Sequence, residues 1–179
     1  MFVLLAVPLG VVLGLLLGGR LDRLGQLEFR WPWLAIAGLV VQVLLFAPAV
    51  ADRIPPDVGA VIYVLSTAAV LAAVVRNVRT PGMVLVVLGA LSNLAAVVAN
   101  GGVMPTTAPA LAAAGLAPTD GFSNSAVLAD PRLAPLTDIF AIPAAFPLAN
   151  VFSIGDVLIA LGIVVVVALA MRRREPSTD

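Results

Sequence analysis

Apolar residues occur in five long runs along the chain, and the segments between them are rich in polar residues, proline and glycine. The runs cover residues 2–19, 33–50, 58–75, 82–99 and 154–171. Each run holds about 18 residues, which in an α-helix is long enough to cross the hydrocarbon core of a bilayer. The pattern predicts an all-α fold, a polytopic membrane bundle of five transmembrane helices. Residues 1–174 would then form one membrane domain, followed by a disordered tail at 175–179.

The longest polar segment, residues 100–153, separates the fourth run from the fifth and is broken by many prolines and glycines. It also contains many apolar residues, so we expect it to fold back onto the helices as an ordered extracytoplasmic cap. Within it, Thr107 before an alanine-rich stretch that ends near Gly115 predicts a short helix. A second helix is expected over residues 131–141, where apolar positions have helical spacing.

The start of the fifth run carries the signature of a helix N-terminus. Ser153 directly precedes the run and Asp156 follows three positions later, which is the spacing of a capping box. Phe152 and Val157 are placed to form a hydrophobic staple around it. We therefore expect the last helix to begin at Ile154.

Arginine supplies every basic charge, and its distribution predicts an orientation in the membrane. Arg53 and Arg132 fall on one side of the five-helix arrangement and eight arginines fall on the other. The eight are Arg20, Arg23, Arg30, Arg76, Arg79, Arg172, Arg173 and Arg174. Because basic loops remain in the cytoplasm, we expect the C-terminus inside and both the N-terminus and the cap outside. A signal peptide is the alternative for residues 2–19, but Arg20 follows that apolar run instead of preceding it.

The composition removes several classes of chemistry. The 179-residue chain is 61% hydrophobic and has a mean hydropathy of +1.12, more apolar than a typical soluble domain. It contains no cysteine, histidine or lysine. These absences exclude thiol catalysis, disulfides, Schiff bases and most zinc, iron or haem sites, so neither a metal nor a cofactor is expected. With a net charge of zero and no basic patch among exposed aromatics, nucleic-acid binding has no support.

Three uncharged polar residues lie at a similar depth in the predicted bundle. Gln42, Ser66 and Asn93 each fall roughly 9–12 Å below the outer surface, at 1.5 Å per helical residue. Roofed by the cap, such a layer would line a small-molecule pocket. The alternative is that these side chains hydrogen-bond the helices to one another. Both interpretations stay open at this point.

Asn100, Gly101 and Gly102 follow the fourth run directly. They are typical of a helix C-terminus with glycine in the left-handed conformation. Alternatively, two glycines expose the backbone so that its amides and carbonyls contact a ligand. Asn93 and Asn100 are seven residues apart and share one helix face, which favours the second interpretation.

Asp138 and Asp156 are the two acids near the expected outer mouth that would work as a pair. Paired carboxylates serve acid–base hydrolysis or bind a cation. Capping of the last helix accounts for Asp156 without any catalytic role. No nucleophile, base or third partner accompanies the two acids, so we assign no catalytic residue.

Several stretches together resemble an uncharacterised bacterial family of small multi-pass membrane proteins. The stretches are Arg76-Asn77 before Pro81-Gly82, Asn93, the NGG-x-MP sequence at residues 100–105, Leu136-Thr137-Asp138 with Pro143, and the S-I-G-D sequence at residues 153–156. The resemblance covers nearly the whole chain and implies a bacterial cytoplasmic membrane location and the five-helix plan. It implies no activity.

These observations lead to a non-enzymatic membrane protein as the first hypothesis. It would bind a lipid, a quinone-like molecule or another small hydrophobic ligand beneath the cap, or act as an accessory subunit of a membrane protein partner. The alternative is a small transporter or a membrane-embedded enzyme that uses Asp138 and Asp156. A purely structural partner of a larger complex is a third possibility, favoured if the small-residue face of Gly10, Gly14 and Gly18 points outward.

Overall fold

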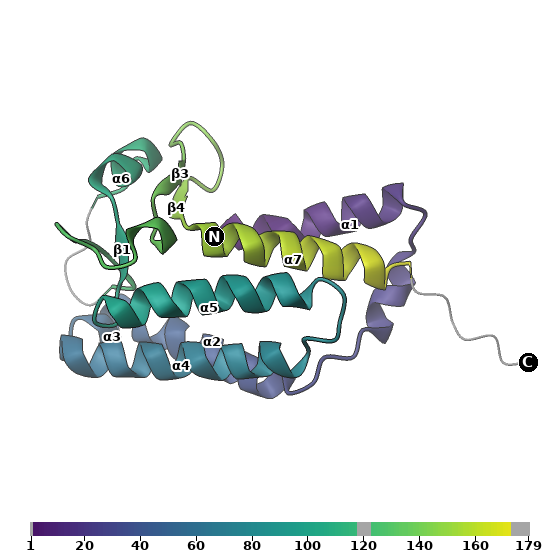
Figure 1. The fold of residues 1–179 in the computed structure, drawn as a ribbon, viewed down its shortest axis with the longest axis horizontal. Coiled ribbons are helices and arrows are strands. Elements are labelled where there is room, and N and C mark those ends of the chain that lie inside the picture. Colours follow the sequence, from purple (N-terminus) through teal and green to yellow (C-terminus); the bar gives the residue numbers. More distant parts are fainter. Residues whose placement is uncertain (1, 118–122, 173–179) are drawn as a thin grey trace, which may run out of the picture.

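The computed structural model describes residues 2–117 and 123–172. Five α-helices of eleven or more residues run side by side along its long axis, and the short elements gather mainly at one end (Figure 1). The long helices are α1 (Ala6–Leu16), α2 (Pro32–Leu45), α4 (Pro56–Arg76), α5 (Met83–Ala99) and α7 (Ile154–Ala170). Their contacts give the spatial order α1, α7, α5, α4, α2.

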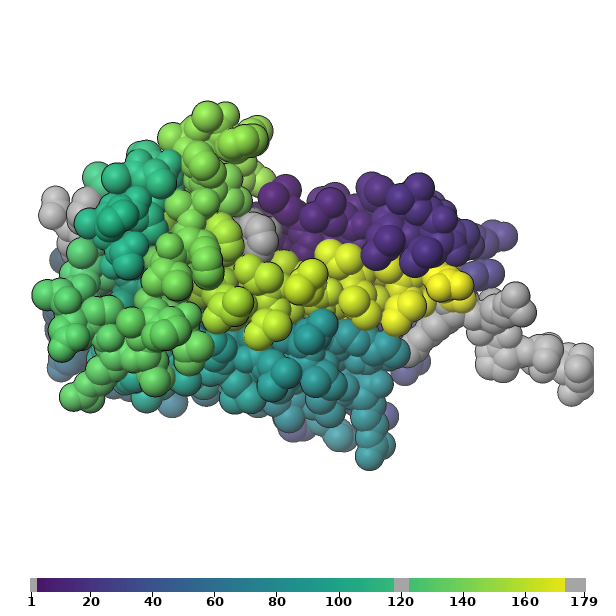
Figure 2. Space-filling model, turned by 45° about the horizontal axis from the view of Figure 1, so that its top comes forward, coloured from purple at the N-terminus to yellow at the C-terminus, as the bar shows by residue number. Residues whose placement is uncertain are grey.

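The remaining elements are short. Two 3₁₀ helices, η1 (Phe2–Leu5) and η2 (Leu21–Gln26), flank α1, and the single turn α3 (Pro48–Ala51) follows α2. Between α5 and α7 the chain forms β1 (Met104–Thr106), α6 (Ala108–Ala114), β2 (Ser125–Val127), η3 (Ala134–Leu136), β3 (Phe140–Ile142) and β4 (Asn150–Phe152). We call the described part of residues 100–153 the cap, and Figure 2 shows it gathered over one end of the helices.

The prediction of five transmembrane helices is wrong. Among the described residues only α4 is both long and apolar enough to cross a membrane. At 1.5 Å per residue its 21 residues span about 31 Å, whereas the 14 residues of α2 span only about 21 Å. The apolar runs are longer than the helices within them, because glycine and proline end those helices early: α1 stops before Gly18 and α2 before Pro48.

The expected all-α class is also wrong, because the cap contains two small β-ladders. β1 pairs in parallel with β2, and β3 pairs antiparallel with β4. The helix expected over residues 131–141 is reduced to η3 followed by β3. Pro135 and the left-handed backbone of Leu133 prevent a continuous helix there.

Close backbone contact holds α5 against α7. A Cβ atom added at Gly89 would collide with the carbonyl oxygen of Gly155, and one added at Gly162 would lie 2.8 Å from the carbonyl oxygen of Gly82. The two antiparallel helices therefore approach through two glycine pairs seven residues apart. The core formed mainly by α4, α5 and α7 continues beside these pairs and includes Val74, Met83, Val86 and Val166.

The small-residue face of the first helix points inward. Gly10 and Gly14 are buried, and added Cβ atoms there would meet Val167 of α7 and Met171, which directly follows α7. Gly18 lies beyond the end of α1 with nothing within 4 Å of an added Cβ atom. An outward-facing face was the condition for the structural-partner hypothesis, so the packing of Gly10 and Gly14 removes its support.

Candidate functional site

The N-terminus of α7 forms the predicted capping box. Ser153 Oγ accepts a hydrogen bond from the Asp156 amide at 3.1 Å, and the Ser153 amide donates to Asp156 Oδ2 at 3.2 Å. The predictions for the start of α7 and for its capping residues are confirmed. The predicted helix between Thr107 and Gly115 is confirmed as well, with the Thr107 side chain capping α6.

Asn93 of α5 joins this capping box from the neighbouring helix. Its Nδ2 donates to Asp156 Oδ1 at 2.8 Å, and its Oδ1 accepts from Ser153 Oγ at 2.8 Å. Ser153 is 0% exposed, and Gly155 leaves room for the Asn93 amide directly beside it. Asn93 and Asp156, both predicted site residues, are therefore brought together. Both oxygens of the Asp156 carboxylate accept a hydrogen bond, one from the Asn93 side chain and one from the Ser153 amide.

Asp138 reaches the same end of the molecule from the cap. Its backbone is fixed against β1: its amide donates to the Pro105 carbonyl at 2.9 Å, and its carbonyl accepts from Thr106 Oγ1 at 3.1 Å. No residue in 2–117 or 123–172 donates a hydrogen bond to its carboxylate. Burial, with a further contribution from the negative charge of Asp156, raises the pKa of Asp138 to about 7. The Asp138 carboxyl group, with this pKa, therefore titrates near neutral pH.

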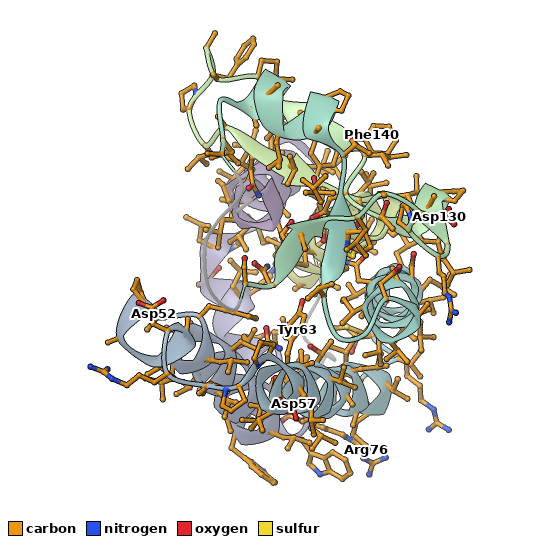
Figure 3. The ribbon with its side chains drawn as sticks, turned by 90° about the vertical axis from the view of Figure 1, so that its left-hand side faces the viewer. Asp52, Asp57, Tyr63, Arg76, Asp130 and Phe140 are labelled. Carbon is orange, nitrogen blue, oxygen red and sulfur yellow. The ribbon has the colours of Figure 1, made fainter. Side chains whose placement is uncertain are left out.

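Tyr63 is a site residue that the sequence analysis missed. It lies in α4, packs edge-on against Phe46 at 5.1 Å between ring centroids, and contacts the buried cluster of Ala96, Val97 and Met104. Figure 3 shows it on the side of α4 that faces the cap. It is the only tyrosine in the chain and the only aromatic residue in the run 58–75, which is the signal that would have identified it.

The predicted polar layer divides into two separate groups. Gln42 Nε2 donates to Thr67 Oγ1 at 3.1 Å and links α2 to α4. Ser66 Oγ donates to the Tyr63 carbonyl at 2.9 Å on its own helix. Asn93 belongs instead to the junction of α5 and α7. Gln42 and Asn93 therefore hydrogen-bond one helix to another, as in the packing interpretation of the layer, whereas Ser66 bonds only within α4.

Asn100 fastens the cap to the end of α5. Its Nδ2 donates to the carbonyls of Ala96 and Arg132, and its Oδ1 accepts from the Arg132 amide, each at 2.8 Å. The side-chain amide of Asn100 thus satisfies both the backbone amide and the backbone carbonyl of Arg132, 32 positions away. This role differs from the predicted ligand contact.

Replacing Asn100 with leucine is expected to loosen the cap without unfolding the helices. The loss of hydrogen bonds worth about 1–2 kcal/mol in total would raise amide exchange in residues 131–137 roughly tenfold, as measured by hydrogen–deuterium exchange. Asn124→Leu is the matched control, because Asn124 is exposed in the same cap and donates no side-chain hydrogen bond within the described residues. Equal exchange in both variants would show that Asn100 does not hold the cap.

An apolar groove lies beside the cap, between the ends of α4 and α5. It has a volume of about 270 Å³ and is lined by Ala60, Val61, Val64, Leu65, Val98, Gly101 and Gly102. We call it the outer groove. Both glycines have left-handed backbone, and a Cβ atom at Gly102 would collide with Ala60, so only glycine lets the chain cross α4 this closely. Gly101 has open space around it, which leaves its backbone accessible at the groove.

The described part of the chain is thus a helical protein with one helix of membrane-spanning length and a mixed α/β cap. Where the cap meets the helices lie an apolar groove and a polar junction, by which we mean Asn93, Asp138, Ser153 and Asp156. The chain belongs to a family of unknown function (DUF5317), which it matches over residues 26–168. No curated protein and no solved structure matches the chain. Membership of an uncharacterised family is confirmed, and the family assigns no activity.

Proposed function

We propose that this protein is a membrane protein that binds one hydrophobic chain of a lipid-like ligand in the outer groove. The observation that carries the proposal is the groove itself, an apolar hollow of about 270 Å³ between α4, α5 and the backbone of Gly101 and Gly102. Its volume is just below the roughly 300–1,000 Å³ of pockets that enclose whole drug-sized molecules. A single acyl or isoprenoid chain therefore suits it better than a complete polar metabolite.

The membrane location is supported by the surface of the helices. α4 is apolar over a membrane-spanning length, and α1 and α2 expose large aliphatic side chains such as Leu16 and Val43. Such side chains are stable in contact with lipid and costly in contact with water. We place the arginine-rich end of α4 in the cytoplasm and the capped end outside, following the positive-inside rule.

The polar junction next to the groove would supply the head-group contacts. Leu136, two residues before Asp138, packs against the same buried cluster of Ala96, Val97 and Met104 as Val64 of α4, and Val64 also lines the outer groove. The groove and the Asp138 segment thus adjoin the same buried cluster. A ligand with an apolar chain and a small hydrogen-bonding head would meet both an aliphatic surface and a carboxyl group that exchanges its proton near pH 7.

Filling the groove tests the proposal. Val98 is 55% exposed and lines the groove, so Val98→Trp is expected to occupy the groove without disturbing the core. Native mass spectrometry of the gently extracted wild-type protein should show a reproducible added lipid mass, and the variant should lose most of it. Val43→Trp is the matched control, because Val43 is 72% exposed on α2, away from the groove.

Equal lipid retention in the two variants would overturn this proposal. Release of the wild-type protein with a second polypeptide and without lipid would instead favour an accessory subunit.

A second function, acid–base chemistry or proton-coupled transport by Asp138 and Asp156, is favoured by one observation. Burial and the Asp156 charge raise the pKa of Asp138 to about 7, which suits a group that gives and takes a proton. This function requires Asp138 to titrate near neutral pH. A carboxyl signal of Asp138 that stays ionised down to pH 5, followed by carbon-13 NMR, would exclude it.

A further inference from the structure

Two adjoining cavities lie at the other end of the helices, and Arg30, Arg76 and Arg79 line both. The first, of about 460 Å³, has walls of Trp31 and of aliphatic residues from the end of α4. The second, of about 320 Å³, is polar and includes Asn77. We call the two together the arginine site. An apolar compartment and a polar compartment thus share three arginine residues.

Asn77 fastens the backbone of Arg30 to the end of α4. Its Oδ1 accepts from the Arg30 amide at 2.8 Å, and its Nδ2 donates to the Arg30 carbonyl at 2.8 Å and to the Ala73 carbonyl at 2.7 Å. Asn77 is only 5% exposed. Because Asn77 follows Arg76 directly, this clamp fixes Arg30 beside Arg76, although the two are 46 positions apart. The Asn100–Arg132 clamp at the capped end has the same three hydrogen bonds.

Trp31 is held in an unfavourable backbone conformation next to this clamp. Its φ angle is +59°, a left-handed value that bulky residues rarely adopt. Its ring lies 5.7 Å from the Arg76 guanidinium, within cation–π distance. Tryptophan is favoured at the level of lipid head groups, where its ring contacts both apolar and polar surroundings. The strained conformation therefore positions an interfacial side chain beside a positive charge.

The arginine site carries uncompensated positive charge. Within residues 2–117 and 123–172 the structure forms one ion pair, between Arg20 and Asp22. Glu28 lines the polar compartment, but its carboxylate makes no ion pair with Arg30, Arg76 or Arg79 there. Three arginines and one carboxylate line the polar compartment, and this excess of positive charge matches a phosphate, because arginine binds phosphate oxygens through paired N–H donors.

We propose that the arginine site binds an anionic phospholipid, with the phosphate on Arg30, Arg76 and Arg79 and the upper acyl chain along Trp31. The polar compartment receives the head group, and the apolar compartment receives the chain. This proposal rests on the membrane location given above and is independent of the outer groove, which lies at the opposite end of α4. The bound lipid would anchor the arginine-rich end at the membrane surface.

The experiment compares retention of phosphatidylglycerol and phosphatidylcholine in native mass spectrometry after extraction from vesicles of each lipid. We expect the wild-type protein to retain phosphatidylglycerol preferentially. Arg76→Gln or Arg79→Gln should each lower the apparent affinity about fivefold, the equivalent of roughly 1 kcal/mol per basic residue at an anionic surface. Arg53→Gln and Arg132→Gln at the capped end are the matched controls and should leave retention unchanged.

Three results would overturn the proposal. Equal losses of phosphatidylglycerol in the control arginine variants would show a diffuse charge effect. Equal retention of both lipids would show that the site does not distinguish head groups by charge. Displacement of phosphatidylglycerol by millimolar inorganic phosphate would make the occupant a soluble phosphate. Val98→Trp should leave phosphatidylglycerol retention intact, so that failure of the outer groove and failure of the arginine site are told apart.

Discussion

Adding a single methyl group at Gly89 or Gly155 is expected to destabilise the protein by about 2–3 kcal/mol. A Cβ atom at Gly89 would collide with the Gly155 carbonyl oxygen, and one at Gly155 would collide with the Asn93 amide. Moving either neighbouring group is costly, because the Gly155 carbonyl is part of the helix backbone and the Asn93 amide is held by hydrogen bonds to Ser153 and Asp156. The two helices would have to separate.

Thermal unfolding in detergent micelles measures this effect. For a chain of this size a loss of 2–3 kcal/mol corresponds to a decrease of roughly 4–12 °C in Tm. Gly25→Ala is the control, because an added Cβ atom there meets nothing within 4 Å, and its Tm should stay within about 2 °C of the wild-type value. The direction of the change in Tm is informative, because alanine has a higher helix propensity than glycine by about 1 kcal/mol and would otherwise raise Tm. An increase of Tm in Gly89→Ala would show that α5 and α7 do not pack this closely.

The features of this fold that could be predicted from the sequence are those formed by residues close to one another along the chain. The capping box at Ser153 and Asp156 and the helix from Thr107 to Gly115 are defined by side chains within a few positions of one another. Local chemistry is sufficient for such features, because the hydrogen bonds that stabilise them close within one helical turn.

Helix length could not be read from hydropathy alone. An apolar run shows which residues avoid water, but glycine and proline decide where the helix inside it ends. Thus the run 33–50 contains a helix that stops at Leu45, before Pro48, and the run 2–19 contains one that stops at Leu16. Only in α4, which has proline at its first helical position, does the helix exceed the apolar run.

The sequence analysis selected residues of the candidate site but did not predict which of them contact one another. Asn93 and Asp156 were both selected, yet their contact depends on the glycine pairing of α5 with α7, which no local pattern encodes. Gln42 was grouped with Asn93 by depth, but depth along a helix says nothing about which neighbour its face meets. Rotation of one helix about its axis separates residues that share a depth.

Replacing Asp138 with asparagine is expected to stabilise the protein above neutral pH. The pKa of Asp138 is about 7 in the folded chain, against 3.8 for an unperturbed aspartate, because burial and Asp156 disfavour its charge. Below about pH 4 the carboxyl is protonated in both the folded and the unfolded chain, and its charge costs nothing. Between pH 4 and 7 the unfolded chain ionises first, so the free energy of unfolding falls as the pH rises. Above pH 7 the folded chain carries the full cost.

Asp138→Asn lacks this titration, so its stability should match the wild-type value near pH 4 and exceed it at pH 8 by about 2–4 kcal/mol. Tm measured from pH 4 to pH 8 for the variant, the wild-type protein and Asp57→Asn checks the expectation, since Asp57 is exposed on the first turn of α4. Parallel pH profiles for all three would mean that Asp138 is solvated. The expected result would show that this carboxyl opposes folding at neutral pH, which points to a role in binding or proton exchange and not in stability.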